Sequence, residues 1–174
     1  MYLSKMIGYA VCFWMAGSVI AAACVNDIPD TQQIYGWKEK VRVYPSEMLF
    51  RAKLDSGAKT SSINATSIKE IKRDGDDWVR FTINNLDGDE DTLELEVERF
   101  VKIKQHEGPS DRRPVVRMGI CLGTLYKEVE VNLVDRSKFI TGMLIGRAFM
   151  EKDVLIDPST TYSYPAKCKV DDKK

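Results

Sequence analysis

The sequence has no excess of charge of either sign. Its 174 residues include 26 Lys or Arg and 26 Asp or Glu, so the formal net charge at pH 7 is zero. A chain without a basic balance has no long-range field to draw it onto nucleic acid or onto an anionic membrane surface. We therefore expect no nucleic-acid partner.

The chain also lacks the ligand patterns of metal and nucleotide sites. Zinc sites need about three or four Cys, His or carboxylate ligands at workable spacing, yet the one histidine is His106 and there is no Cys-x-x-Cys or His-Glu-x-x-His. Residues 57–60, Gly-Ala-Lys-Thr, lack the first glycine of a Gly-x4-Gly-Lys-Thr phosphate loop. We expect no metal and no other cofactor, and we interpret His106 as a solvated loop residue.

Long apolar runs are absent except near the N-terminus. Lys5 is followed by an uncharged run, residues 6–23, that ends in three alanines. A basic start, an apolar middle and a small-residue end are the three parts of a secretory signal. A retained membrane anchor is the alternative, because the run approaches the length of a span. We expect residues 1–23 to be a signal peptide and the protein to be exported to a bacterial periplasm.

Cysteine is scarce, and an odd number remains after export. Loss of Cys12 with the signal leaves Cys24, Cys121 and Cys168 in an oxidising compartment. Two interpretations of Cys24 are open: acylation at a lipobox, which would anchor the protein to the outer membrane through a tether, residues 24–33, or plain cleavage that leaves a thiol. Acylation would leave Cys121 and Cys168 free to pair, and two unpaired thiols are the alternative, because the sequence cannot place their Cβ atoms.

Most of the sequence after the tether alternates between apolar and polar residues. Such alternation is typical of half-buried strands. It recurs in the segments 41–43, 50–54, 79–83, 93–97, 100–104, 115–122 and 125–133. Clusters of Gly, Asn and Asp separate the segments, as tight reversals require.

Two shorter runs and one helical segment complete the pattern. Residues 143–145 and 154–156 are apolar runs of the kind buried on both faces, and only 147–152 has the composition of a helical turn or two. The sequence therefore predicts one all-β domain, residues 34–165, with a barrel or sandwich architecture, followed by a C-terminal tail, residues 166–174.

One alternating segment runs directly into a polar motif. Residues 50–54 are followed by Asp55, Ser56 and Gly57. An aspartic peptidase needs a carboxylate on a rigid strand end, a hydroxyl residue that ties the paired loops together, and a glycine that lets backbone N–H groups approach the carboxylate. The triplet supplies these in order, although it is also a common turn. We name Asp55, Ser56 and Gly57 as the candidate catalytic residues.

Other blocks resemble retropepsins and, more closely, a bacterial RimB-type family of retropepsin-like proteins. The blocks are 35–39, 52–62, 113–116, 144–147 and 156–158. Gly146 matches a glycine that opens a short helix under the catalytic loop, a structural role in close packing. Ser56 stands where Thr is usual, and Asn64 where many members have His. Members are also described as ATP-dependent zinc proteases, and the missing ligand patterns argue against both cofactors here.

The resemblance implies a retropepsin-like closed barrel with one short helix, acting as a homodimer. Two carboxylates about 3 Å apart cannot both ionise, so one activates water while the other protonates the scissile carbonyl. Asp55 and its symmetry mate would form this pair in a two-fold dimer. We expect an exported aspartic endopeptidase that cleaves a peptide or protein. A catalytically silent binding or scaffolding domain is the alternative.

The residues after the motif are candidates for substrate binding. Ala58, Lys59 and Thr60 continue the loop, and a cation at Lys59 would attract an anionic group. The resemblance implies association with peptide ligases that add acidic residues, which favours an acidic substrate. A solvated Lys59 is the alternative.

Two polar loops could close over a bound peptide and exclude water from it. We expect residues 84–92 to be the closing hairpin, although their run of acidic side chains would repel an acidic substrate. The second loop, 105–113, carries Arg113, which would attract one, so Arg113 is also a candidate for substrate binding.

Mass spectrometry of the protein from its native host tests the export. We expect a chain that begins at Cys24, with added acyl mass if the lipobox interpretation holds. A chain that retains Met1 would contradict export and the tether together.

Overall fold

The computed structural model describes residues 32–103 and 111–169. The expected signal peptide, Cys24 and His106 lie outside the described residues. Within the described ranges no helix is long and apolar enough to cross a membrane.

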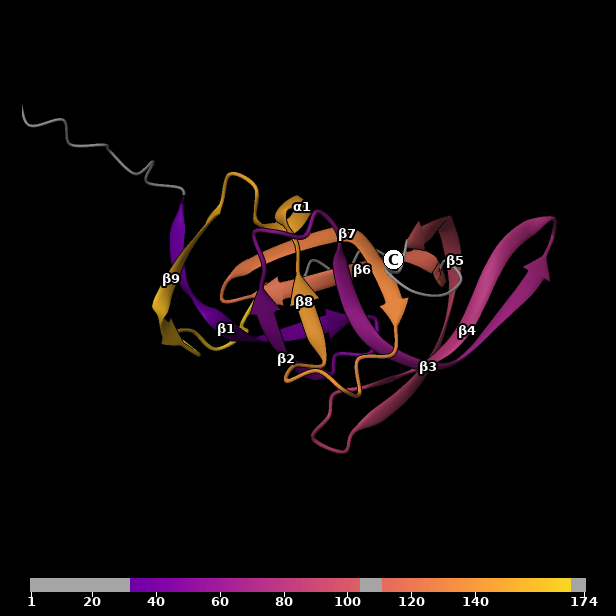
Figure 1. The fold of residues 1–174 in the computed structure, drawn as a ribbon, viewed down its shortest axis with the longest axis horizontal. Helices are drawn as coiled ribbons and strands as arrows, with labels where there is room; N and C mark the ends of the chain where they lie inside the picture. The colour runs from indigo at the N-terminus through magenta and orange to yellow at the C-terminus, as the bar shows by residue number, and fades with distance from the viewer. Residues whose placement is uncertain (1–31, 104–110, 170–174) are drawn as a thin grey trace, which may run out of the picture.

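The described chain folds into nine strands and one short helix (Figure 1). The elements are β1 (Gln33–Tyr44), β2 (Leu49–Leu54), β3 (Ser61–Arg73), β4 (Asp76–Asn84), β5 (Glu90–Ile103), β6 (Asp111–Leu122), β7 (Leu125–Val134), β8 (Met143–Ile145), α1 (Arg147–Met150) and β9 (Val154–Thr161). The all-β expectation is confirmed, and the described residues of each alternating segment lie within a strand.

Two details of the elements differ from the sequence pattern. The segments 93–97 and 100–104 were expected as separate strands, but a register shift between Val97 and Arg99 lets one strand, β5, include 93–97 and 100–103. Residues 61–73 show no alternation, yet they form β3, because its first five residues are buried whatever their polarity. Tertiary contacts therefore decide this strand.

Six strands close into a ring. β1 pairs with β2, β2 with β8, β8 with β3, β3 with β7, β7 with β6, and β6 returns to β1. Alternate side chains of these strands point inward and exclude water from one core. The large side chains buried there include Phe50, Ile63, Ile120, Leu133, Met143 and Ile145.

A three-stranded wing extends from the ring. β3 continues past its ring partners to pair with β4, and β4 pairs with β5, which leads into β6 (Figure 1). The turn between β4 and β5 packs on the start of β2: Asn85 Nδ2 donates to the Leu49 carbonyl at 3.2 Å, and Asp87 pairs with Arg51 at 2.7 Å. The expectation that 84–92 closes over the site is therefore wrong, because this turn lies at the end of β2 opposite Asp55.

The C-terminal segment packs on the outside of β1 and β6. Cys121 and Cys168 form a disulfide, and the Lys167 N–H donates to the Gly123 carbonyl at 2.7 Å. The interpretation in which the two cysteines pair is confirmed. Tyr164 packs edge-on against Tyr35, whose pKa is raised to about 12, chiefly by burial.

β9 is an edge strand. It pairs in parallel with β1 through Ile34 and Leu155 and through Tyr35 and Ile156. The expectation that 154–156 is buried on both faces is wrong, since these residues are only half-buried. The physical reason is that no second strand of the described chain covers the outer edge of β9.

The disulfide should contribute to stability by restricting the unfolded chain. Replacing Cys168 with Ser is expected to lower the free energy of unfolding by about 2–4 kcal/mol, because the bridge closes a loop 47 residues long. Urea unfolding followed by tryptophan fluorescence measures this change. The unaltered protein in excess dithiothreitol is the matched control and should unfold like the variant. Equal midpoints with and without reductant would contradict the prediction.

Candidate active site

Asp55 lies at the end of β2, where two parallel strands hold its backbone. Leu54 is in register with Ile145 of β8, and the Asp55 N–H donates to the Ile145 carbonyl at 2.9 Å. The carboxylate therefore projects from a sheet rather than from a free loop. A rigid origin of this kind suits a group that must be held in one position.

Two donors act on the Asp55 carboxylate, whose side chain is 26% exposed. Oδ1 accepts the N–H of Gly57 at 2.9 Å, and Oδ2 lies 3.6 Å from Nζ of Lys53. A Cβ at position 57 would lie 3.1 Å from Oδ1, so glycine permits this close approach. Both contacts hold the carboxylate in one orientation.

Lys53 is a site residue that the sequence pattern did not single out. It precedes Asp55 by two residues, and residues two apart in a strand share a face. The alternation of residues 50–54 therefore contained the signal that Lys53 lies beside Asp55. Lys59 instead lines a groove on the other side of the loop.

The helix α1 clamps the loop that follows Asp55. The N–H groups of Arg147 and Ala148 donate to the carbonyls of Ala58 and Lys59, both at 2.9 Å. Arg147 Nη1 also donates to the Ser56 carbonyl at 2.7 Å. These three bonds hold the backbone of residues 56–59 in one conformation.

Gly146 allows this clamp to form. A Cβ there would lie 2.7 Å from the Lys59 carbonyl oxygen, which is too close for any other residue without a backbone shift. Its N–H donates to Ser61 Oγ at 3.1 Å. The glycine therefore lets β8 turn directly into α1 beneath the loop.

Two grooves flank the loop. One, of about 610 Å³, is lined by Ser56, Arg147 and residues 154–156 of β9. The other, of about 780 Å³, is lined by Ala58, Lys59 and Thr60 together with parts of β5, β6 and β7. The three predicted substrate-binding residues of the loop thus share one groove.

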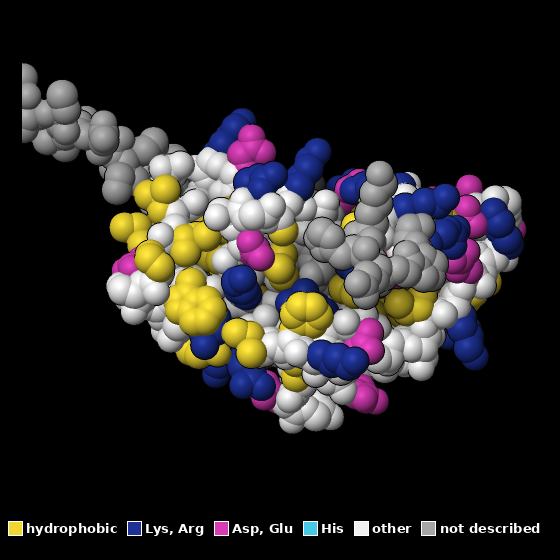
Figure 2. Space-filling model, in the orientation of Figure 1, with side chains coloured by type: hydrophobic (Ala, Val, Ile, Leu, Met, Phe, Trp, Pro, Cys, Tyr) yellow, Lys and Arg dark blue, Asp and Glu magenta, His cyan; other side chains and the backbone are white. Residues whose placement is uncertain are grey.

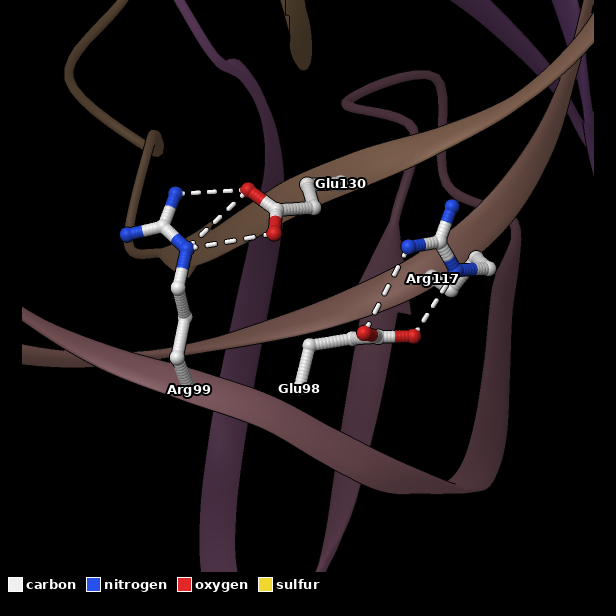
Figure 3. Close-up of polar contacts among 4 residues, drawn as sticks. All are labelled: Glu98, Arg99, Arg117 and Glu130. Carbon is white, nitrogen blue, oxygen red and sulfur yellow. Dashed lines mark hydrogen bonds and ion pairs between the residues drawn. The ribbon is translucent and has the colours of Figure 1, made fainter.

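Paired charges cross the far wall of the larger groove (Figure 3). Arg99 of β5 binds both carboxylate oxygens of Glu130 on β7, with Nη2 at 2.6 Å from Oε2, and Arg117 Nε lies 2.8 Å from Glu98 Oε1. Hydrogen bonds from Arg99 chiefly hold the pKa of Glu130 below its ordinary value, and the charges of Arg117 and Lys59 act in the same direction. Lys59 is therefore close enough to this wall for its positive charge to lower the pKa of Glu130.

Asn64 occupies a buried position at the centre of the sheet. Its Oδ1 accepts the backbone N–H of Arg136 at 2.7 Å, and its Nδ2 donates to the Asn84 carbonyl at 3.1 Å. The residue where the family pattern often has His thus joins two connections of the fold, and its side chain is occupied by structural hydrogen bonds.

Arg113 and Arg136 lie on the same side of the site. Arg113, on β6, pairs with Asp111 at 2.6 Å. Arg136, between β7 and β8, is buried. Burial, and then the charge of Arg113, lower the pKa of Arg136, whereas the charge of Asp55 raises it. Sequence reasoning missed Arg136, because nothing in a polar connection indicates that its arginine is buried.

No group of three or more His, Cys, Asp or Glu side chains that could hold a metal ion occurs in residues 32–103 and 111–169.

Several known proteins are similar to this chain. A Legionella pneumophila protein of unknown function, Lpg0085, has 34% sequence identity and a TM-score of 0.65 over 75% of this chain and 96% of its own. Probable alpha-L-glutamate ligases of Shewanella pealeana and Desulfotalea psychrophila are 36% and 37% identical over 115 and 113 residues. Those matches cover 64% and 63% of this chain, which spans about a quarter of the length of these curated relatives.

A family model described as retropepsin-like aspartic endopeptidase RimB matches residues 34–167, which is most of the chain and includes every described strand except the first residue of β1. The resemblance inferred from the five sequence blocks is confirmed, and the chain belongs to the RimB-like family of retropepsin-like aspartic endopeptidases.

Proposed function

We propose that this protein is an aspartic endopeptidase in which Asp55 activates the attacking water. The observation that carries the proposal is the placement of Asp55: its carboxylate leaves the end of a buried strand, accepts the Gly57 N–H, and sits above a loop clamped by α1. Membership of the family supports the same chemistry. Ser56 and Gly57 complete the motif as residues of the loop.

The complete site requires two copies of the chain. One Asp-Ser-Gly motif supplies one carboxylate, and water activation by an aspartate pair needs a second carboxylate that holds the shared proton. The groove between Ser56 and β9 opens beside the motif. A second copy related by a two-fold axis would bring its own Asp55 to this place.

The unpaired edge of β9 suits such an interface. Val154, Leu155 and Ile156 are half-buried apolar residues that line the groove next to Ser56. In Figure 2 hydrophobic side chains gather on the side of β9 and β1, whereas many charged side chains lie over the wing. Burying the apolar side in a dimer would remove it from water.

The proposed reaction follows from the shared proton. The ionised Asp55 of one copy would take a proton from water as the water attacks the scissile carbonyl, and the protonated Asp55 of the other copy would donate its proton to the carbonyl oxygen. In the breakdown of the tetrahedral diol, the first Asp55 would give its newly acquired proton to the amide nitrogen as the C–N bond breaks, and the second would take a proton from a hydroxyl of the diol. This releases the amine and the carboxylic acid and leaves one shared proton on the pair. Lys53, 3.6 Å from Asp55 Oδ2, would help to orient the first carboxylate.

We propose a peptide or protein substrate that carries acidic residues. The relatives named as probable glutamate ligases support this choice, since the region they share with this chain accompanies an enzyme of glutamate attachment. Lys59 in the larger groove and Arg113 on β6 are cations that would attract such a peptide, and Ala58 and Thr60 would line its path. Export, the periplasmic location and the tether through Cys24 stay part of the proposal.

Replacement of Asp55 with Asn tests the mechanism. Cleavage of a mixed peptide library, followed by mass spectrometry, is expected to fall by about a hundredfold or more, because the amide cannot accept the proton of water. Replacement of Asp77 with Asn is the matched control, since Asp77 is exposed on the wing and pairs with Lys72. Cleavage that persists in the Asp55 variant would exclude the aspartate mechanism, whereas a lack of cleavage by the unaltered protein would favour a binding or scaffolding role.

Replacement of Leu155 with Glu tests the dimer. Sedimentation velocity should show a shift from dimer to monomer, because two glutamates would be buried across the proposed axis, and cleavage should fall with it. Replacement of Ile68 with Glu is the control, as Ile68 is exposed on the wing. A Leu155 variant that stays dimeric and active would contradict an interface at β9.

A further inference from the structure

Arg136 is a buried arginine without a carboxylate partner in the described ranges. Its side chain is 6% exposed. Nε donates to the Thr141 carbonyl at 3.2 Å and Nη1 donates to Ser62 Oγ at 3.0 Å. A guanidinium has five N–H donors, so two bonds leave three N–H groups without a hydrogen bond to residues 32–103 or 111–169. Both of its acceptors are neutral oxygens.

Buried cations are normally paired with anions, and Arg136 has no carboxylate partner in the described ranges. Its free N–H groups are not sealed from solvent, because none of its nitrogens is among the fully buried atoms that lack a partner. Burial first and the charge of Arg113 second lower the pKa of Arg136, and Asp55 acts in the opposite direction. Because Arg113 already pairs with Asp111, an incoming anion would chiefly neutralise Arg136.

The position of Arg136 in the sheet puts this region beside the proposed catalytic carboxylate. Ser62, which accepts its hydrogen bond, is in register with Leu144 of β8, and Leu144 is in register with Lys53 of β2. Residues paired across strands share a face, and Asp55 follows Lys53 by two residues on that face. Arg136 and Asp55 therefore face the same space above β8.

The charged groups around this space come from four elements of the described chain. Lys53 on β2 contacts Asp55 itself, and Arg136 lies in the connection between β7 and β8. Arg113 contributes from β6, and Arg147 on α1 is tied to the Ser56 carbonyl next to Asp55. Asp111 already pairs with Arg113, which leaves Lys53, Arg136 and Arg147 around Asp55, so the space favours a further anion.

An apolar rim limits which anion fits. The ring of Phe139 stacks on the guanidinium of Arg136 at 4.5 Å, and both Phe139 and its neighbour Ile140 are exposed, at 55% and 69%. A peptide offers apolar stems and backbone to such a rim together with a planar carboxylate for the guanidinium fork. A free inorganic ion would leave the apolar rim in water.

We propose that Arg136, with Arg113, binds a carboxylate of the peptide substrate beside Asp55. The inference rests on the proposed peptidase function and assigns its acidic specificity to a named buried residue. The bound carboxylate would accept the N–H groups of Arg136 that the fold leaves free, and the residue to which it belongs would set the register of the peptide against Asp55. The carboxylate could belong to an acidic side chain or to the peptide C-terminus.

Binding measurements test the inference without requiring cleavage. In the Asp55→Asn background, which prevents turnover, isothermal titration would compare three acetylated peptides: tetraglutamine amide, tetraglutamate amide and tetraglutamine with a free C-terminus. Arg136→Gln should weaken binding of one or both carboxylate peptides by roughly tenfold to a hundredfold, as expected for loss of a buried charge-assisted bond, and leave the uncharged peptide unchanged. The peptide that loses affinity identifies the source of the carboxylate.

The controls separate local binding from net charge and from misfolding. Arg73→Gln removes one positive charge on the wing, where Arg73 pairs with Glu94, and should change no affinity by more than about twofold. If Arg136→Gln melts below the assay temperature, Arg113→Gln, at a 25% exposed side chain, takes its place and should show the same selectivity. Equal losses for charged and uncharged peptides, or no loss, would overturn the inference.

The two proposals fail in different ways. Selective binding of a carboxylate peptide by a protein that cleaves nothing would support Arg136 as its receptor and contradict the peptidase function alone. If cleavage depends on Asp55 but Arg136→Gln leaves the affinity for carboxylate peptides unchanged, only the carboxylate site would be contradicted.

Discussion

The insertion of β8 between β2 and β3 is the constraint on which the site depends. This strand has three residues, yet it pairs with both neighbours, and its last carbonyl accepts the Asp55 N–H. Directly after it, Gly146 lets α1 begin under the loop and supply N–H groups to the carbonyls of Ala58 and Lys59. Because one short segment holds both the end of β2 and the loop, the backbone of Asp55 and the backbone around its carboxylate are both held in place.

The same face of the sheet concentrates positive charge around that carboxylate. Lys53 comes from β2, Arg136 from the connection before β8, and Arg147 from α1. In a single chain, Asp55 is the one carboxylate among the described residues that these three cations surround. In the proposed dimer, the two copies of Asp55 would share one proton, and the surrounding cations would attract the one negative charge that remains on the pair. The charges thus suit a paired site with an acidic ligand better than an isolated carboxylate.

The outer edge of the fold is organised separately from the site. The disulfide between Cys121 and Cys168 and the packing of Tyr164 on Tyr35 hold the C-terminal segment against β1 and β6. This arrangement leaves β9 as an edge strand with half-buried apolar residues beside the groove at Ser56. One side of the ring is thus covered by the chain itself, and the other remains available to a second copy.

Local pattern was enough to predict every strand except β3, as well as the motif and the family of this protein. Alternation reports which face of a strand is buried, and Asp55, Ser56, Gly57 and Gly146 are recognisable because their roles require those residue types. Tertiary structure alone decided that β3 is a strand, that 84–92 packs at the far end of β2, and that the two cysteines meet. It also decided that Lys53 rather than Lys59 contacts Asp55 and that Arg136 is buried. The physical reason is that each of these facts depends on contacts between segments distant in sequence, and those contacts exist only once the ring has closed.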